Sequence, residues 1–350
     1  MKFTVIANTS PRSESFGFIR PIADCKNVES ILVCGEGSLT SYKKVIYITD
    51  GAIKNKLLRL IHRTLNVIVK SRKSDYIIGI YEIPHGLIAY VSAWVLGKKS
   101  ILCIIGNPSY SKLRKGLRLW IMNVMINRMS YTTVTGSNSR RHLEKKGFDV
   151  NKIEILPNSI DTEVFRNNHS KKEYDIISLG RLSPEKELIN LLKIVILIKK
   201  NKSNVQVAIA GSGPERERLE TYITENGLEE NVKLIGYIDD KIDFYNKGCI
   251  FLLTSRTEGL PRTVIESMSC GTPCIVSRVG DIEDLVINNQ NGYLIDNCND
   301  LVVFAEKVYS LLNDEVKIQK FSENARKIVE KKFSHNAATR FWEKLLAHIN

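Results

Sequence analysis

The chain has 350 residues, of which 43% are hydrophobic and 25% are charged, so it is long enough for two cores and too apolar for a disordered protein. Its formal net charge of +13 lies entirely in residues 1–165, because residues 166–350 hold 26 basic and 26 acidic side chains. This asymmetry predicts two domains with different functions, of which the first binds an anionic partner.

A membrane span, a secretion signal and a metal framework are not predicted. The longest apolar candidate, residues 189–198, is short and contains Lys193, so no bilayer-spanning helix is expected. The start, MKFTVIAN, has a strand-like pattern in place of the apolar core of a signal peptide, which predicts a cytoplasmic protein. The seven cysteines form no CxxC pair and are interpreted as buried thiols, and the six histidines are scattered, so no metal site is expected.

Apolar runs in the first half predict strands at residues 3–7, 31–34, 45–49, 76–81, 100–105 and 132–135. Two basic segments with helical spacing, 54–73 and 112–125, account for most of the charge excess. They are typical of helices with a core face and a solvated face, but the second carries Trp120 and also fits an anionic lipid surface. The polar run 167–173 (NNHSKKE) predicts a linker to the second half.

The second half alternates strand-like runs with helical patterns, which is typical of a parallel sheet covered by helices on both faces. Strands are expected at residues 174–179, 205–210, 232–235, 249–253, 273–276 and 292–295. Helices are expected at residues 185–200, 215–226, 261–269 and 281–287. Residues 316–348 are predicted to be helical throughout, with a break near Ser334.

Unusual loops follow four of the strands expected in the second half. Ligands of doubly wound sheets bind beyond the carboxyl ends of the strands, so these loops form the candidate site. Each loop alone is explained by a tight turn or by surface charge. Together they are complementary, because two cations and a helix amino end suit a diphosphate, two carboxylates suit sugar hydroxyls, and a glycine-lined slot suits a flat base. The loops are residues 180–186 (GRLSPEK), 211–214 (GSGP), 236–237 (GY) and 258–261 (EGLP), the last followed by Glu266.

Other nucleotide and metal motifs do not occur in the sequence. Arg216 stands where the third glycine of GxGxxG belongs, so residues 211–216 are not a dinucleotide fingerprint, and a P-loop is absent. No DxD metal motif occurs. The nearest approach, Asp281-Ile282-Glu283, is interpreted as the start of a helix.

Residues 176–295 resemble the donor-binding domain of glycosyltransferase family 4, a retaining group with the two-domain GT-B fold. The resemblance is carried by GRLSPEKE, AGSGPERERLE, VKLIGY and SRTEGLPRTVIESMSCGTPCIVS, which include two glutamates, Glu258 and Glu266, separated by seven residues. LPNSID at residues 156–161 is similar to the interdomain LPNGID of the family, with Ser159 in place of the glycine.

The resemblance implies an α/β protein of the GT-B fold, with two Rossmann-like doubly wound domains facing across a cleft. Residues 1–165 are expected to bind the acceptor, residues 166–333 to bind the nucleotide-sugar donor, and residues 334–350 to form a C-terminal helix that crosses back to the first domain.

The resemblance also implies a role for each residue of the four loops. Arg181 and Lys186 would bind the donor diphosphate in the turn that begins at Gly180. The backbone amides of Gly259 and Leu260 would donate to the same group. Glu266 would bind the ribose hydroxyls and Glu258 the transferred sugar, while Gly211, Gly213 and Tyr237 would border the base. Fixed cations stabilise the charge of the leaving diphosphate, so Arg181 and Lys186 are expected to replace a metal ion, and no cofactor is predicted.

The first half departs from the family pattern at the acceptor side. The glycine-rich loop of the family is reduced to residues 13–17 (SESFG), and residues 106–108 (GNP) stand where relatives carry a histidine, which leaves Asn107 as a polar contact at most. His85 follows the strand at residues 76–81 and is a candidate for contact with the acceptor or the sugar. The alternative for His85 is a capping or packing role.

The implied function is retaining transfer of a sugar from a UDP- or GDP-sugar to a lipid-linked or envelope polysaccharide acceptor. The basic first half predicts a peripheral protein at the inner face of the cytoplasmic membrane, bound to anionic lipid. Two alternatives remain open: a DNA-modifying glucosyltransferase of the same fold, and a sugar-nucleotide-binding protein without transferase activity. The basic segments are rich in aliphatic residues and poor in stacking aromatics, which argues against nucleic acid as partner.

Overall fold

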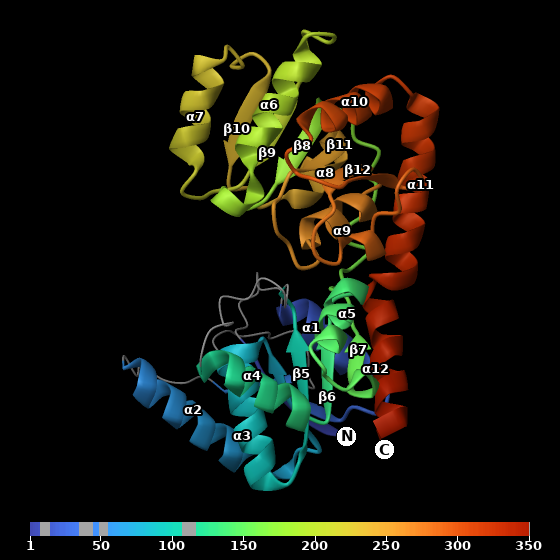
Figure 1. Cartoon of the computed structure of the whole chain (residues 1–350). Coiled ribbons are helices and arrows are strands. Elements are labelled where there is room, and N and C mark those ends of the chain that lie inside the picture. Colours follow the sequence, from blue (N-terminus) through green and yellow to red (C-terminus); the bar gives the residue numbers. More distant parts are fainter. Residues whose placement is uncertain (8–14, 35–44, 49–54, 107–116, 350) are drawn as a thin grey trace. The chain divides into compact units, whose positions relative to one another are not determined.

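The computed structural model describes residues 1–7, 15–34, 45–48, 55–106 and 117–349, and the chain divides into two compact units (Figure 1). Unit 1 comprises residues 1–159 together with residues 335–350, and unit 2 comprises residues 160–334. The division lies inside the LPNSID segment, slightly before the expected boundary at residue 165.

Unit 1 is built on a parallel sheet with the strand order β3-β2-β1-β4-β5-β6-β7. The order reverses at β1, so the carboxyl ends of β1 and β4 form the topological switch point where ligands of such sheets bind. The strands are β1 (Lys2–Ile6), β2 (Ser30–Cys34), β3 (Val45–Ile48), β4 (Tyr76–Ile80), β5 (Lys99–Ile104), β6 (Tyr131–Val134) and β7 (Ile153–Ile155).

Helices cover both faces of the unit 1 sheet. Successive strand residues such as Ile77 and Ile78 point to opposite faces, and their side chains are buried in different cores. One core contains α1 (Ser15–Asp24) and α12 (His335–Ile349), whose Trp342 is fully buried, so the C-terminal helix is an integral part of unit 1. The other core is formed by α2 (Lys56–Lys70), α3 (Leu87–Leu96), α4 (Leu117–Arg128) and α5 (Ser137–Lys145). Short helical turns lie at Ser71–Lys73, Glu82–Gly86 and Val150–Lys152.

Unit 2 repeats this architecture with the strand order β10-β9-β8-β11-β12-β13, and its switch point lies between β8 and β11. All neighbouring strands are parallel. The strands are β8 (Tyr174–Leu179), β9 (Val207–Ala210), β10 (Val232–Gly236), β11 (Gly248–Leu253), β12 (Cys274–Ser277) and β13 (Gly292–Ile295).

The helices of unit 2 divide between the two faces of its sheet. One core contains α6 (Leu188–Lys199), α7 (Arg216–Glu225) and α10 (Leu301–Leu312). The other contains α8 (Lys241–Lys247), α9 (Arg262–Ser269) and α11 (Glu315–Lys332). Single 3-10 turns lie at Pro184–Lys186 and Ile282–Asp284.

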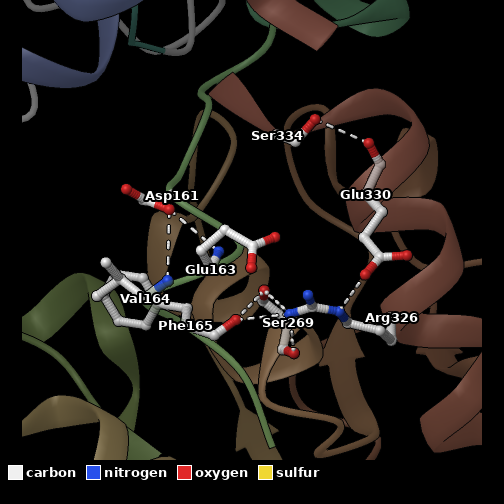
Figure 2. A network of polar contacts seen from close by, with 8 residues as sticks. All are labelled: Asp161, Glu163, Val164, Phe165, Ser269, Arg326, Glu330 and Ser334. Atoms are coloured by element: carbon white, nitrogen blue, oxygen red, sulfur yellow. Dashed lines mark hydrogen bonds and ion pairs between the residues drawn. The ribbon is translucent and has the colours of Figure 1, made fainter. Parts of the chain in front are cut away.

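A polar network fixes the first residues of unit 2 against α9 and α11 (Figure 2). The Asp161 carboxylate accepts hydrogen bonds from the backbone amides of Glu163 and Val164 at 3.0 and 3.3 Å. Arg326 donates to the carbonyl of Phe165 at 2.7 Å and to the carbonyl of Ser269 at 2.9 Å. The segment that enters unit 2 is therefore tied to the helix that carries Glu266.

The predicted fold class of two doubly wound parallel-sheet domains is confirmed. Each predicted strand is present with ends that differ by at most two residues, and the predicted break between the last two helices lies at Phe333 and Ser334. The helix predicted at residues 281–287 is wrong, since only a 3-10 turn forms there.

Five of the seven cysteines are buried as predicted, whereas Cys249 and Cys298 are partly exposed. Within the described ranges, no helix has the length and apolar content needed to cross a bilayer.

Candidate active site

The four loops singled out in the sequence converge at the carboxyl edge of the unit 2 sheet. Leu182 N donates to the Ser212 carbonyl at 3.0 Å, and Gly211 N donates to the Gly236 carbonyl at 2.7 Å, so the loops after β8, β9 and β10 are joined through the backbone. Arg256 N donates to the Glu185 carbonyl at 2.9 Å, which joins the loop after β11 to the loop after β8. The sheet topology thus assembles these segments into one continuous surface.

Glycine is required at two positions because the loops approach so closely. A Cβ at Gly211, whose φ is +135°, would lie 1.8 Å from the carbonyl oxygen of Gly180. A Cβ at Gly213 would lie 2.2 Å from the carbonyl oxygen of Leu182. Packing between the loops explains both glycines, and contact with a base stays a prediction for them and for Tyr237, whose side chain is exposed at the end of β10.

Lys186 and Glu258 form an ion pair across the switch point. The Lys186 Nζ lies 2.6 Å from the Glu258 Oε1, and the Ser255 hydroxyl donates to the same oxygen at 2.7 Å. The lysine and glutamate side chains are only 18% and 13% exposed, so water screens their attraction less than it would at an open surface. Two residues far apart in sequence are therefore held together where the ends of β8 and β11 meet.

Arg181 adds a second cation to the loop after β8. Its side chain is exposed and makes no hydrogen bond or ion pair with the residues that the structure describes. The neighbouring Glu185 has a lowered pKa, chiefly because the Ser183 hydroxyl donates to its carboxylate at 2.6 Å, and the charges of Lys186 and Arg181 contribute. Glu185 therefore stays charged beside the two cations, and Arg181 is the side chain of this loop that extends into solvent.

Gly280 and Asp281 support the backbone of residues 258–259. A Cβ at Gly280, whose φ is +58°, would lie 2.2 Å from the Gly259 carbonyl oxygen, and Asp281 N donates to that oxygen at 2.8 Å. Asp281 is fully buried in this role. Leu260, next along the loop, is buried as well and anchors it to the core.

Glu266 lies on α9 with its carboxylate fixed from two sides. Arg262 Nε donates to Oε1 at 2.8 Å, and the Tyr245 hydroxyl donates to Oε2 at 2.9 Å. Lys241 Nζ lies 3.8 Å from Oε2. The residue is 1% exposed, so this carboxylate is a positioned acceptor whose charge is balanced by neighbours and not by water. Burial and the nearby Glu266 charge raise the pKa of Tyr245 well above its usual range, which keeps its hydroxyl protonated as a donor.

The Tyr245 hydroxyl provides a stability prediction. We expect Tyr245→Phe to lower the free energy of unfolding by about 1.5–3 kcal/mol, because it removes a buried hydrogen bond to a charged group. Urea unfolding followed by circular dichroism measures this change. Tyr309→Phe in α10, a partly exposed tyrosine, is the matched control and is expected to change stability by less than about 0.5 kcal/mol. Equal effects of the two substitutions would refute the assigned role of Tyr245.

His85 is the candidate of unit 1 that the structure describes, since Asn107 lies outside the described residues. It follows β4 within the turn Glu82–Gly86, it is 4% exposed, and its Nδ1 donates to the Ile80 carbonyl at 2.9 Å. Burial lowers the pKa of His85, and the charge of Arg63 lowers it further, which favours a neutral imidazole. This geometry is that of the packing alternative, and contact with an acceptor or a sugar stays a prediction.

Sequence reasoning missed the residues that position the two glutamates. Arg262 had a signal, because a position four residues before Glu266 lies on the same face of a helix. Ser255 lies only three residues before Glu258, in the same loop, but no sequence pattern marked this hydrogen bond. Tyr245 had no signal, since its approach to Glu266 depends on the packing of α8 against α9. Several predicted segments lie outside the described residues: 13–14 of the SESFG loop, 107–108 of the GNP segment, and 112–116 of the second basic segment.

In the part of the chain that the structure describes, no group of histidine, cysteine and acidic side chains could hold a metal ion.

Comparisons with known proteins agree with this architecture. Residues 159–328 match the family model of the glycosyl transferases group 1. The chain is 29% identical to the Staphylococcus aureus capsular polysaccharide biosynthesis glycosyltransferase CapM, over 57% of this chain and 56% of that protein. It is 27% identical to a Campylobacter jejuni N-acetylgalactosaminyltransferase that acts on a diphosphoundecaprenol-linked glycan, over 80% of this chain and 77% of that protein.

Solved structures extend the likeness to both units. The structure of Anabaena HepE in complex with UDP has a TM-score of 0.83 at 17% identity and covers 99% of this chain and 100% of its own. The Staphylococcus aureus TarM structure has a TM-score of 0.72 at 21% identity, over 85% of this chain and 59% of its own. The chain therefore has the GT-B fold, and its residues 159–328 match the glycosyl transferases group 1 family.

Proposed function

We propose that the protein is a retaining glycosyltransferase that transfers a hexose-type sugar from a UDP-sugar to a lipid-linked or envelope polysaccharide acceptor. The observation that carries this proposal is the Lys186–Glu258 pair at 2.6 Å, which places a cation and a carboxylate side by side at the switch point of unit 2. Arg181, exposed on the same loop as Lys186, supplies the second cation.

Charge balance assigns Lys186 and Arg181 to the donor diphosphate. Breaking the bond between the sugar and the diphosphate leaves negative charge on the departing oxygen, and fixed cations stabilise it most where it develops. The backbone amides of Gly259 and Leu260, next to α9, are assigned to the same group. No carboxylate nucleophile is assigned, so we propose attack from the face of the leaving group, with the departing phosphate accepting the proton of the acceptor hydroxyl.

The remaining loop residues are assigned to the nucleoside and the sugar. Glu266 binds the ribose hydroxyls and Glu258 the transferred sugar, while Gly211, Gly213 and Tyr237 border the base. UDP is preferred to GDP as the nucleotide because HepE was solved with UDP and with UDP-glucose. An Escherichia coli relative, 25% identical over 84% of this chain, is named as a UDP-Gal-dependent enzyme that acts on a diphosphoundecaprenol-linked sugar.

The acceptor is assigned by analogy with these relatives, which favours a polysaccharide precursor over DNA. A lipid-linked acceptor requires the enzyme to work at a membrane. The positive charge of residues 1–165 supports binding to the anionic inner face of the cytoplasmic membrane.

Thermal unfolding in the presence of a panel of UDP- and GDP-sugars tests the donor. A bound ligand at 100 times its dissociation constant stabilises a protein by about 2.7 kcal/mol. We expect stabilisation by UDP-sugars and slow release of free sugar from them without acceptor. Stabilisation without any sugar release or transfer would support a non-catalytic binding protein, and no stabilisation by any nucleotide sugar would refute the proposal.

Metal independence is a separate prediction. Because Arg181 and Lys186 are assigned the role of the cation, we expect sugar release to keep at least about half of its rate after treatment with EDTA. The rate before and after chelation, and after addition of Mn²⁺ or Mg²⁺, is the measurement. Loss of nearly all turnover in EDTA with recovery in Mn²⁺ would contradict the assignment of both side chains.

A further inference from the structure

A cavity of unit 2 lies beside β13, the edge strand of its sheet, and is here called the β13 cavity. Its volume is about 550 Å³, within the range of about 300–1,000 Å³ that is typical of sites for small molecules. Its walls are formed by the turn before β13, by β13 itself, and by helices α10 and α11. None of its lining residues belongs to the four loops of the candidate active site.

Two lysine side chains converge on one aromatic ring in the β13 cavity. Lys307 comes from α10 and Lys317 from α11, and the Nζ of each lies 5.3 Å from the centre of the Tyr293 ring. The two ammonium groups are therefore separated by no more than twice this distance, 10.6 Å. Tyr293 is 5% exposed, and the Phe321 ring packs against it at a centroid distance of 5.4 Å, so the shared ring is a fixed wall.

Neither of these lysines has an anionic partner. No carboxylate of the described chain forms an ion pair with Lys307 or Lys317. Asp296, which also lines the cavity, is bound by Arg278 at 2.7 Å. The face of an aromatic ring attracts a cation, but it does not remove the repulsion between two cations that share it. An anion between the two ammonium groups removes this repulsion and accepts charge-assisted hydrogen bonds from both.

The remaining polar side chains of the β13 cavity suit hydroxyl groups. Asn288 Oδ1 accepts from the backbone amide of Leu294 at 3.2 Å, which leaves the Asn288 Nδ2 group as a donor. The Ser310 hydroxyl on α10 and the Asp300 carboxylate before it make no hydrogen bond within the described chain. An amide donor, a hydroxyl and a carboxylate together donate to and accept from neighbouring hydroxyls, such as those of a sugar.

We propose that the β13 cavity binds a sugar that carries one anionic group, a phosphate or a carboxylate. The anion lies between Lys307 and Lys317, and the sugar hydroxyls lie at Asn288, Asp300 and Ser310. A neutral sugar leaves both lysines unpaired, and a bare inorganic anion leaves the hydroxyl-binding side chains unused. The inference does not depend on the proposed function, because a free sugar and a sugar unit of a glycan present the same groups to the cavity.

Saturation-transfer NMR with the full chain tests the proposal, with glucose 6-phosphate, glucuronic acid and glucose as probes. About 0.15 M salt screens loose binding to the basic first half, and excess UDP occupies the candidate active site. We expect at least one anionic probe to bind at least about tenfold more tightly than glucose, and the preferred probe identifies the anion. We also expect this binding to persist when UDP is added.

Lys317→Gln should weaken binding of the anionic probe at least about tenfold and leave glucose binding unchanged. Lys317→Arg keeps the charge and should retain most of the affinity. Lys320→Gln is the matched control, because Lys320 lies one turn further along α11, is exposed and does not line the cavity. This control should leave the binding of every probe unchanged. Circular dichroism verifies that the variants fold.

Two results would overturn the proposal: no binding of either anionic probe, or equal losses in Lys317→Gln and Lys320→Gln. Displacement of the probe by UDP, with no effect of Lys317→Gln, would place the probe at the candidate active site and refute the β13 cavity as its site. Probe binding that depends on Lys317, in a chain that neither binds nor cleaves nucleotide sugars, would refute the proposed function and leave the assignment of the β13 cavity intact.

Discussion

Replacement of Lys186 by alanine is expected to lower turnover by about 10²- to 10³-fold, the loss seen when one preorganised donor to a developing negative charge is removed. It should also weaken UDP and UDP-sugar alike by about 1.5–3 kcal/mol, because both carry the diphosphate that the ammonium group is proposed to bind. Part of the effect arises in the free protein, where Glu258 loses a partner at 2.6 Å while it is only 13% exposed. Calorimetric titration with UDP and steady-state sugar release are the two measurements.

Lys247→Ala is the matched control for Lys186. Lys247 lies on α8 of the same unit and pairs with Asp243 at 3.0 Å and with Glu173 at 3.2 Å, so its removal also breaks ion pairs. We expect no change in UDP affinity from this control. Lys186→Arg should fall between the two, because it keeps the charge and changes the shape of the donor. An unchanged affinity for UDP in Lys186→Ala would refute the diphosphate assignment.

The fold of unit 2 was predictable because buried parallel strands have a plain sequence pattern. Runs such as residues 249–253 (CIFLL) are apolar throughout and are separated by amphipathic helices, so strand positions follow from hydrophobicity. The helix predicted at residues 281–287 failed for a local reason. The Asn291 side chain donates to the Leu285 carbonyl at 3.0 Å and accepts from the Ile287 amide at 2.8 Å, so the backbone after Asp284 is bound by this side chain and does not continue as a helix. Strand β7, only three residues long, has too few residues to show a pattern.

The loops that form the candidate site were predictable from the sequence, but the contacts between their side chains were not. Strand-end positions of Lys186 and Glu258 followed from the sequence, but their direct pairing depends on β8 and β11 being neighbours in the sheet. Strand order is set by long-range packing, which no local pattern encodes. The same limit hid Tyr245, since a residue on α8 reaches Glu266 on α9 only after both helices pack on one face.

The outward apolar side of α2 shows a further limit of sequence patterns. Leu60 and Ile61 are equally apolar, and periodicity assigns both to a core. In the structure Leu60 packs against the core of unit 1, whereas Ile61 is 48% exposed. Neighbouring apolar residues of an amphipathic helix can lie on either side of the edge of its core face, so only the folded structure shows that Leu60 is packed and Ile61 is exposed.

Glu258→Gln is expected to separate sugar binding from nucleotide binding. The carboxylate is proposed to contact the transferred sugar, so UDP has no group that needs it. The substitution also releases Lys186 from its ion pair at 2.6 Å, and this lysine then binds diphosphate without first losing a charged partner. We therefore expect an affinity for UDP that is unchanged or higher, together with turnover reduced about 10- to 100-fold, the equivalent of one lost hydrogen bond to a charged group.

The comparison with Lys186→Ala makes this result decisive. If Glu258 served only to position Lys186, both substitutions would weaken UDP binding, whereas a role at the sugar lowers turnover and leaves UDP affinity intact. Ser255→Ala is an internal control, because it removes the other donor to Glu258 Oε1 at 2.7 Å and keeps the carboxylate in place. We expect it to reduce turnover less than Glu258→Gln does. Weaker binding of bare UDP by Glu258→Gln, of the size found for Lys186→Ala, would show that Glu258 acts on the diphosphate through Lys186 and that the sugar contact is wrong.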